Sequence, residues 1–279
     1  MDKSKRPRYR DNDGSRFYRA GRLSPEETWQ ILGDDLARVL DDALQAFWRK
    51  PLRMDAERVR WWHGAIFARH FPHDGGRFRQ ERTFFGVMTP TGGMRQLEGS
   101  SPETQRRDLE EVCVSFNECI DAFHDVDAVS ILDRTRPAAA LYAGILRVHP
   151  FADGNLRTGF IALSAALWSL RLPNVSFIGP EEMIAHDDSL VPALMSASGD
   201  VEPFARLLAE RMDSLKRLDR AHTVCGDHLV ETTPEVNREV AESAMLLSQG
   251  ARRAIEMMRE ADQEAAREAG SVEATADAV

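Results

Sequence analysis

The sequence predicts a mainly α-helical domain that carries one small β-hairpin. Several segments place apolar residues three and four positions apart, which is the period of an amphipathic helix. Residues 82–99 instead join a run of Thr, Phe and Val to a second short run through a Thr-Pro-Thr-Gly-Gly turn. No segment repeats with a period of roughly 20 to 50 residues, so a helical array is not expected.

The first helix is expected over residues 24–48. Ser24 can cap it, Pro25 suits its first turn, and two acidic residues favour the positive end of its dipole. A second helix is expected over 55–70 and ends at a Pro-His-Asp-Gly-Gly break. After the hairpin, further helices are expected over 102–123, 137–148, 157–170 and 202–218.

Charge divides the chain into three parts. Residues 1–22 hold eight Lys and Arg against three acidic residues, so we expect a flexible basic arm there, either solvated or docking to an anionic partner. Residues 220–279 hold six Arg against twelve acidic residues, and we expect an acidic helix over 234–268 with a disordered tail. The compact domain is therefore expected over 23–219.

The composition argues against several classes of protein. The 279 residues are 43% apolar, which suffices for a core, and the formal net charge of −9 argues against nucleic acid as a partner. Three cysteines are too few for a disulfide framework. The longest uncharged apolar run, 160–170, is shorter than the roughly 20 residues of a membrane span, and no secretory signal is visible. A cytoplasmic protein, or one delivered into a host cytosol, is expected.

Residues 149–157, His-Pro-Phe-Ala-Asp-Gly-Asn-Leu-Arg, form a short loop between two expected helices. The loop ends at a helix N-terminus, whose unpaired N–H groups and partial positive charge suit a phosphate group. Gly154 lets the backbone approach a ligand, Asn155 can donate from its side chain, and Arg157 offers a planar fork to phosphate oxygens.

The same loop holds a candidate base and a candidate metal ligand. His149 can act as a base near neutral pH, and Asp153 can hold a hard divalent cation that bridges phosphates. These parts suffice for the transfer of a phosphate-linked group to a hydroxyl.

The loop resembles the signature of the Fic/Doc family, whose Fic branch reads H-P-F-x-[D/E]-G-N-G-R-x-x-R. Seven positions agree at fixed spacing: His149, Pro150, Phe151, Asp153, Gly154, Asn155 and Arg157. The wider layout is also similar, with a Gly-Arg-Phe-Arg element at 76–79, a hairpin in the place of the family's target-positioning flap, and a helical core. The resemblance covers about residues 55–218 and implies the Fic fold.

This resemblance implies transfer of a nucleotide monophosphate, usually AMP from ATP, to a Ser, Thr or Tyr hydroxyl of a protein. His149 would deprotonate the hydroxyl, and Asp153 would bind Mg²⁺. The nucleotide phosphates would be held by Gly154, Asn155, Leu156 and Arg157, and Phe151 would pack under the loop. The hairpin, at about 83–97, would hold a segment of the target by strand addition.

Two positions depart from the Fic signature. Leu156 stands in the place of its second Gly, and Phe160 in the place of its second Arg, which family members aim at the terminal phosphate. The Doc branch shares both departures and transfers the γ-phosphate, so a protein kinase is one alternative. The two residues also continue an apolar helix stripe with Leu163, Leu167 and Leu170. If that stripe belongs to the core, a catalytically inactive interaction protein is the other alternative.

The family's inhibitory helix, S/T-x-x-x-E-G/N, has no match in this sequence. The closest segment, 198–203, ends in Pro and not in Gly or Asn. Inhibition would therefore require a separate antitoxin or another mechanism, and the acidic C-terminal helix could regulate the domain, pack on it or form a homodimer.

Other candidate residues carry less information. Residues 222–228 hold two histidines and Cys225 at metal-like spacing, but no fourth ligand is evident nearby. His63 is expected at an interface or at the surface. Cys113 and Cys119 are expected on different faces of one helix, both as packing residues.

Overall fold

A computed structural model describes residues 32, 35–43, 53–69, 71–88, 94–175, 180–195 and 199–218. The expected basic arm (1–22), the acidic helix and tail (220–279) and the metal-like segment 222–228 lie outside these residues. Within the described part of the chain, no helix combines the length and the apolar character needed to cross a bilayer.

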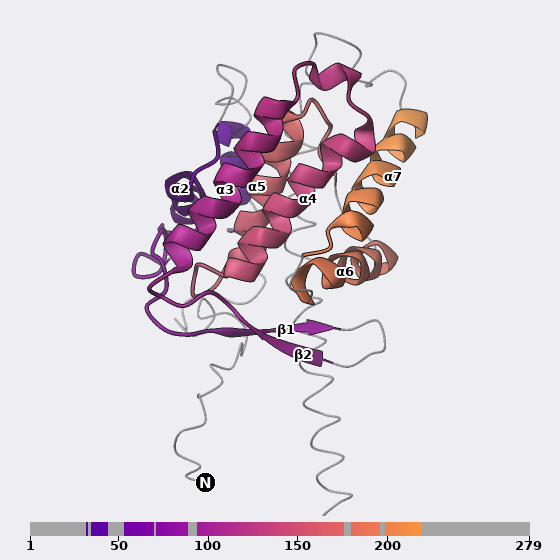
Figure 1. The fold of residues 1–279 in the computed structure, drawn as a ribbon. Helices are drawn as coiled ribbons and strands as arrows, with labels where there is room; N and C mark the ends of the chain where they lie inside the picture. Colours follow the sequence, from indigo (N-terminus) through magenta and orange to yellow (C-terminus); the bar gives the residue numbers. More distant parts are fainter. Residues whose placement is uncertain are drawn as a thin grey trace, which may run out of the picture.

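The described chain is mainly helical with one two-stranded sheet, which confirms the predicted fold class (Figure 1). In chain order the elements are α2 (Ala56–Phe67), β1 (Phe84–Met88), β2 (Met94–Glu98), α3 (Gln105–Ala122), the 3₁₀ helix η2 (Val126–Ala128), α4 (Ile131–Val148), α5 (Asn155–Ser169), α6 (Pro180–Met195) and α7 (Glu202–Leu218). Residues 35–43 are also helical, inside the first expected helix. The hairpin and four of these helices, α2, α3, α5 and α7, lie close to their expected bounds.

Two helices differ from expectation. α4 begins at Ile131 and not at Pro137, because the Ser130 side chain caps it by accepting the Asp133 N–H at 3.1 Å. Proline commonly opens a helix, and here Pro137 lies inside one instead. α6 has no counterpart in the sequence analysis, since acidic residues and a histidine interrupt its apolar period.

α4 and α5 form the centre of the domain (Figure 1). Every side chain of α5 from Asn155 to Trp168 is buried, except that of Leu156. α2 and α3 pack on one side of this pair, and α6 and α7 pack on the other. α5, which begins within the loop of residues 149–157 (the motif loop), is therefore packed against neighbours around its circumference.

The hairpin lies at the end of the domain where α4 leads into α5 (Figure 1). Its antiparallel register places Phe85 opposite Leu97 and Val87 opposite Arg95. Phe85 and Val87 are buried and alternate with the exposed Gly86, so one face of the hairpin packs against the helices.

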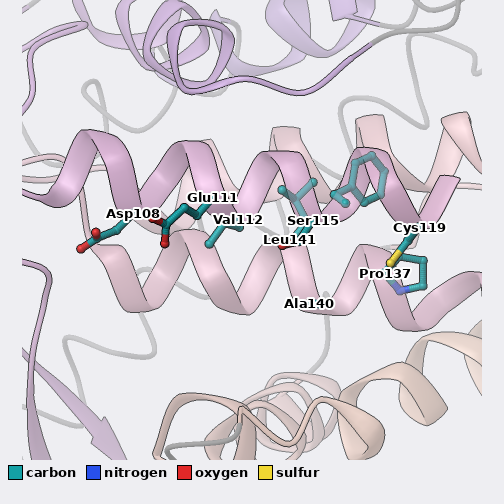
Figure 2. A pocket seen from close by; sticks show the side chains of 9 residues that line it. Asp108, Glu111, Val112, Ser115, Cys119, Pro137, Ala140 and Leu141 are labelled. Atoms are coloured by element: carbon teal, nitrogen blue, oxygen red, sulfur yellow. The ribbon is translucent and has the colours of Figure 1, made fainter. Parts of the chain in front are cut away.

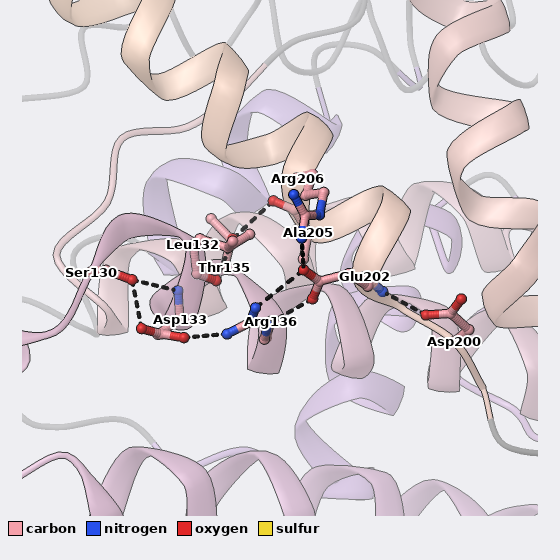
Figure 3. A network of polar contacts seen from close by, with 9 residues as sticks. All are labelled: Ser130, Leu132, Asp133, Thr135, Arg136, Asp200, Glu202, Ala205 and Arg206. Atoms are coloured by element: carbon pink, nitrogen blue, oxygen red, sulfur yellow. Dashed lines mark hydrogen bonds and ion pairs between the residues drawn. The ribbon is translucent and has the colours of Figure 1, made fainter.

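Charged side chains join α4 to α7 (Figure 3). Arg136 donates two hydrogen bonds to Glu202, from Nε at 2.7 Å and from Nη2 at 3.1 Å, and Arg206 pairs with the same carboxylate at 2.8 Å. Arg136 also contacts Asp133 on its own helix. Because these side chains are partly exposed to water, the network adds little to the free energy of unfolding.

A groove of about 270 Å³ runs between α3 and α4, with Asp108 and Glu111 toward one end and Cys119 toward the other (Figure 2). None of the site residues expected from the sequence lines this groove. Cys119 is exposed there, so the expectation that it is a packing residue is wrong. Cys113, which faces elsewhere on α3, is buried as expected.

Candidate active site

Two left-handed residues bracket the loop between α4 and α5. His149 ends α4 with φ 49° and ψ 57°, and Gly154 precedes α5 with φ 77°. For a residue with a Cβ atom, this conformation costs roughly 1–2 kcal/mol, so surrounding contacts must hold His149 in it. Gly154 also needs its missing side chain, because a Cβ there would lie 2.3 Å from Cε2 of Phe67.

The His149 imidazole is half-buried beneath the hairpin. The Phe85 ring stacks on it, with 4.5 Å between ring centroids and 7° between planes. Its Nδ1 lies 3.3 Å from the Leu146 carbonyl oxygen, which can only accept, so Nδ1 carries the proton and Nε2 is the basic nitrogen. Burial lowers the pKa of the imidazole from 6.5 to about 4, and the Arg79 cation contributes to the decrease. The ring is therefore neutral at pH 7.

Arg79 holds the loop from the side of the hairpin. Its side chain is buried, and it donates to the backbone carbonyl oxygens of His149 (Nε, 2.7 Å), Glu81 (Nη1, 2.6 Å) and Ser100 (Nη2). Its backbone N–H donates to the carbonyl oxygen of Pro150 at 3.0 Å. Burial lowers the pKa of Arg79, but a guanidinium remains charged at neutral pH. One residue thus contacts both the first and the second residue of the loop.

His63, on α2, holds the other end of the loop. It is 1% exposed, so the expectation of a surface or interfacial position is wrong. Its Nδ1 accepts the Gly76 N–H at 2.9 Å, so Nε2 bears the proton and donates to the Asp153 carbonyl oxygen at 3.0 Å. Its ring stacks on Phe151 at 3.9 Å. Burial lowers the pKa of His63 to about 3, and the side chain is therefore satisfied without a charge.

Asn155 closes the loop from within. Its Oδ1 accepts the Phe151 N–H at 3.0 Å, and its Nδ2 donates to the Phe151 carbonyl oxygen at 2.9 Å. Phe151 itself is fully buried under the loop. The Asn155 side chain is thus engaged in loop closure, and its role toward phosphate stays a prediction.

The start of α5 has the features of an anion site. The N–H groups of residues 155–157 precede the first intrahelical hydrogen bond, from Thr158 N–H to the Gly154 carbonyl oxygen at 3.0 Å. No acidic residue lies in this first turn to offset the positive end of the dipole. Arg157 is buried, with its guanidinium 5.9 Å from the centre of the Phe67 ring. The turn therefore combines backbone donors with a cation, which suits a phosphate group.

Asp153 supplies the carboxylate of the loop. It is half-buried, and its Oδ1 accepts the Gly154 N–H at 2.5 Å. Among the described residues, no three His, Cys, Asp or Glu side chains gather as a metal site made by protein alone would require. A magnesium ion that takes one protein carboxylate and the phosphates of a nucleotide fits this donor set, because Mg²⁺ commonly binds in that way.

Comparison with known proteins decides the family. Residues 53–167 match the model of the Fic/DOC family. This segment is a Fic/DOC domain. The chain is 28% identical over 186 residues to the protein adenylyltransferase fic-1 of Caenorhabditis elegans. The aligned residues cover 64% of this chain and 32% of that protein. The chain is 25% identical over 187 residues to the protein adenylyltransferase Fic of Drosophila virilis, covering 67% of this chain and 34% of that protein. The chain thus spans about a third of the length of these relatives.

Solved structures of Fic proteins align with part of this chain. Residues 134–508 of Fic-1 from C. elegans align with a TM-score of 0.49 and 21% identity, covering 72% of this chain and 55% of that one. BepC from Bartonella tribocorum, with bound AMPPNP, aligns with a TM-score of 0.44 and 16% identity, covering 64% of this chain and 85% of that one.

In this Fic domain, the position that the Fic signature gives to a second Arg lies in the core. Phe160 is 1% exposed, and its ring lies 5.8 Å from that of Tyr142, edge to face, and 6.2 Å from that of His186. Leu156 is partly buried and packs against the same core. The apolar stripe is therefore confirmed as a packing surface, and the side chain at position 160 offers no charge to a nucleotide.

Glu202 is the acidic residue of the segment closest to the family's inhibitory helix. In this Fic domain it begins α7 and is bound by Arg136 and Arg206 (Figure 3). Its carboxylate therefore belongs to the contact between α4 and α7.

Sequence reasoning did not assign Arg79, His63 or Phe85 to the site. A sequence does not reveal which carbonyl oxygens a buried arginine reaches, and it does not reveal which ring a strand residue covers. A signal was present for His63: Val59 and Ile66, four residues before it and three after it, place it on the apolar face of α2.

Proposed function

We propose that this Fic domain transfers AMP from ATP to a Ser, Thr or Tyr hydroxyl of a target protein. The observation that carries the proposal is one loop that joins a neutral imidazole, His149, to a helix N-terminus with a buried cation, Arg157. The names of the curated relatives, both protein adenylyltransferases, support the same chemistry. The target would dock along the hairpin by strand addition.

His149 is the base of the proposed reaction. Its Nε2 takes the proton of the target hydroxyl while the hydroxyl oxygen bonds to the α-phosphorus, and the bond to pyrophosphate breaks. The contact between Nδ1 and the Leu146 carbonyl oxygen keeps the required tautomer. Because the pKa of His149 is about 4, the transfer loses its base as the pH falls through that value. Between pH 6 and 8, this group adds no pH dependence.

The start of α5 binds the phosphates in this proposal. The N–H groups of residues 155–157 would bind the α- and β-phosphates, and the Arg157 guanidinium would neutralise charge at the β/γ end. Gly154 lets the nucleotide approach the backbone. Asp153 would hold a magnesium ion, which neutralises phosphate charge when bound.

Labelled ATP tests the proposal directly. The full chain is incubated with candidate target proteins and with ATP labelled in either the α- or the γ-phosphate. Label is expected on protein from the α-position only. His149→Ala should reduce the transfer at least about 100-fold, since general-base catalysis contributes that much. His124→Ala, at an exposed histidine between α3 and η2, should leave it unchanged.

The remaining outcomes separate the alternatives. Label from the γ-position only would support a Doc-like protein kinase instead. Absence of both labels would contradict both transferases, and a melting experiment then applies. A nucleotide at 100 times its dissociation constant should stabilise a binding-competent domain by about 2.7 kcal/mol, whereas an inactive interaction protein with an occluded site should show no shift.

A further inference from the structure

We infer that Arg79 is a positioning residue for His149: its guanidinium joins the end of α4 to the root of the hairpin and thereby fixes where the imidazole points. The inference rests on the proposed function, because it assigns a role toward the same base. Arg79 lies seventy positions before His149, outside the motif loop.

The contacts of Arg79 converge on the end of α4. Its Nε donates to the His149 carbonyl oxygen at 2.7 Å, and its Nη2 lies 3.4 Å from the Val148 carbonyl oxygen. The last carbonyl groups of a helix have no partner inside the helix, so groups outside it must donate to them. Here the Ser100 N–H donates to Val148 and the Arg79 side chain to His149. The same Nη2 donates to the Ser100 carbonyl oxygen, just beyond β2. A planar guanidinium has its donors in fixed directions, so these groups hold one relative position.

The backbone conformation of His149 explains why the contacts of Arg79 affect the position of the imidazole. The residue is left-handed, at φ 49°, a conformation that side chains with a Cβ avoid. Without Arg79, the carbonyl oxygen of His149 would lose its side-chain donor, whereas that of Val148 keeps the Ser100 N–H at 3.1 Å. The favoured relaxation of His149 is then toward right-handed backbone. Such a change turns the Cα–Cβ bond of His149 and moves the imidazole away from its present stack on Phe85.

The root of the hairpin is tightly packed against His149 and Arg79. A Cβ atom on Gly99 would lie 2.9 Å from the Cβ of His149 and 3.0 Å from Nη2 of Arg79. Gln105 supports the clamp from α3, since its Nε2 donates to the Arg79 carbonyl oxygen at 2.6 Å. Arg79, Gly99 and His149 are thus packed in direct contact, and each limits the position of the others.

The test compares Arg79→Met and Arg79→Lys with a matched control. Arg134→Met removes another mostly buried arginine that bonds a backbone carbonyl oxygen, that of Leu170, near the opposite end of α4. Proteins with ¹³C-labelled histidine report each imidazole by its Cε1–H signal, and His149→Gln assigns the signal of His149. In the native protein, the stacked Phe85 ring should shift this signal away from that of free histidine.

In Arg79→Met, the His149 signal should move toward the free-histidine position while those of His63 and His186 stay in place. The kcat for transfer from α-labelled ATP should fall about 100-fold, as for a misplacement of roughly 1 Å, with KM for ATP unchanged. Arg79→Lys should give an intermediate shift and an intermediate kcat, because one ammonium replaces only part of the fork. Arg134→Met should change neither readout.

An unmoved His149 signal in Arg79→Met would overturn the inference, and so would a loss of transfer that appears in KM for ATP alone. If Arg79→Met does not fold, the folded Arg79→Lys variant decides, and there an unmoved signal and an unchanged kcat would overturn it. Failure of the proposed function looks different: the native protein would transfer no label, while the His149 signal would still report whether Arg79 positions the ring.

Discussion

Arg79 holds the motif loop and Arg136 holds the contact between α4 and α7, but the surroundings of these two arginines differ. Arg79 is buried and donates to backbone carbonyl oxygens, whereas the Arg136 side chain is 41% exposed and pairs with carboxylates that water also reaches. Removing the first leaves buried acceptors without a donor, and removing the second exchanges an ion pair for hydration. The geometry of the site thus depends on buried groups that bind the main chain, and the ion pairs on the surface contribute little to it.

Gly154→Ala should give the largest effect on stability in the region of the loop. The added methyl group meets the Phe67 ring and forces alanine into a left-handed conformation. Together these should lower the free energy of unfolding by about 2–4 kcal/mol, as measured by urea denaturation. A second substitution, Phe67→Leu, should recover part of the lost stability, because it relieves the clash with the ring but leaves alanine in a left-handed conformation. A loss below about 0.5 kcal/mol in Gly154→Ala would contradict the packing described here.

Acid should weaken the loop through His63. The folded pKa, about 3, lies below the unfolded value near 6.5, so the neutral ring stabilises the fold fully above pH 6.5. This contribution is lost as the pH falls from 6.5 toward 3. At pH 4.5 the loss should be roughly 2–3 kcal/mol relative to pH 7.

His63→Gln is the matched control for this prediction, since glutamine offers a donor and an acceptor but does not titrate. Urea unfolding of both proteins at pH 7 and 4.5, without divalent ions, gives the comparison. The native protein should lose more stability on acidification than the variant. Equal losses would show that His63 is not held neutral.

The pair of Arg136 and Glu202 should give the smallest effect. A double-mutant cycle with Arg136→Met and Glu202→Gln should yield a coupling free energy well below either of the two effects above, and salt should reduce it further. A coupling free energy as large as the stability lost in Gly154→Ala would contradict the conclusion that the exposed ion pairs between α4 and α7 contribute little.

The fold was predictable wherever the apolar period is regular. α3 and α7 have charged residues on one face and apolar residues on the other, and their bounds follow from that pattern. α6 has no such regularity, because His186 is a buried polar residue on a helix that also carries several acids. The early start of α4 was missed because Pro137 is tolerated inside the helix, and tertiary packing decides that.

Only part of the candidate site was predictable from the sequence. The loop from His149 to Arg157 carries its own signature, and a local spacing suffices to find it. Arg79 and His63 reach the same loop from positions seventy and ninety residues away from their partners, His149 and Asp153. A single sequence does not specify which distant groups meet, so these two contacts required the three-dimensional structure.

The enclosure of α5 on every side affects how an anion would bind at its first turn. The amide groups there belong to a helix that is buried from Arg157 to Trp168, so they are already oriented before an anion binds. A bound phosphate group would therefore impose little loss of conformational freedom on its receptor. Differences in affinity between nucleotides should then originate in the ligands, from their charge and from the water they release.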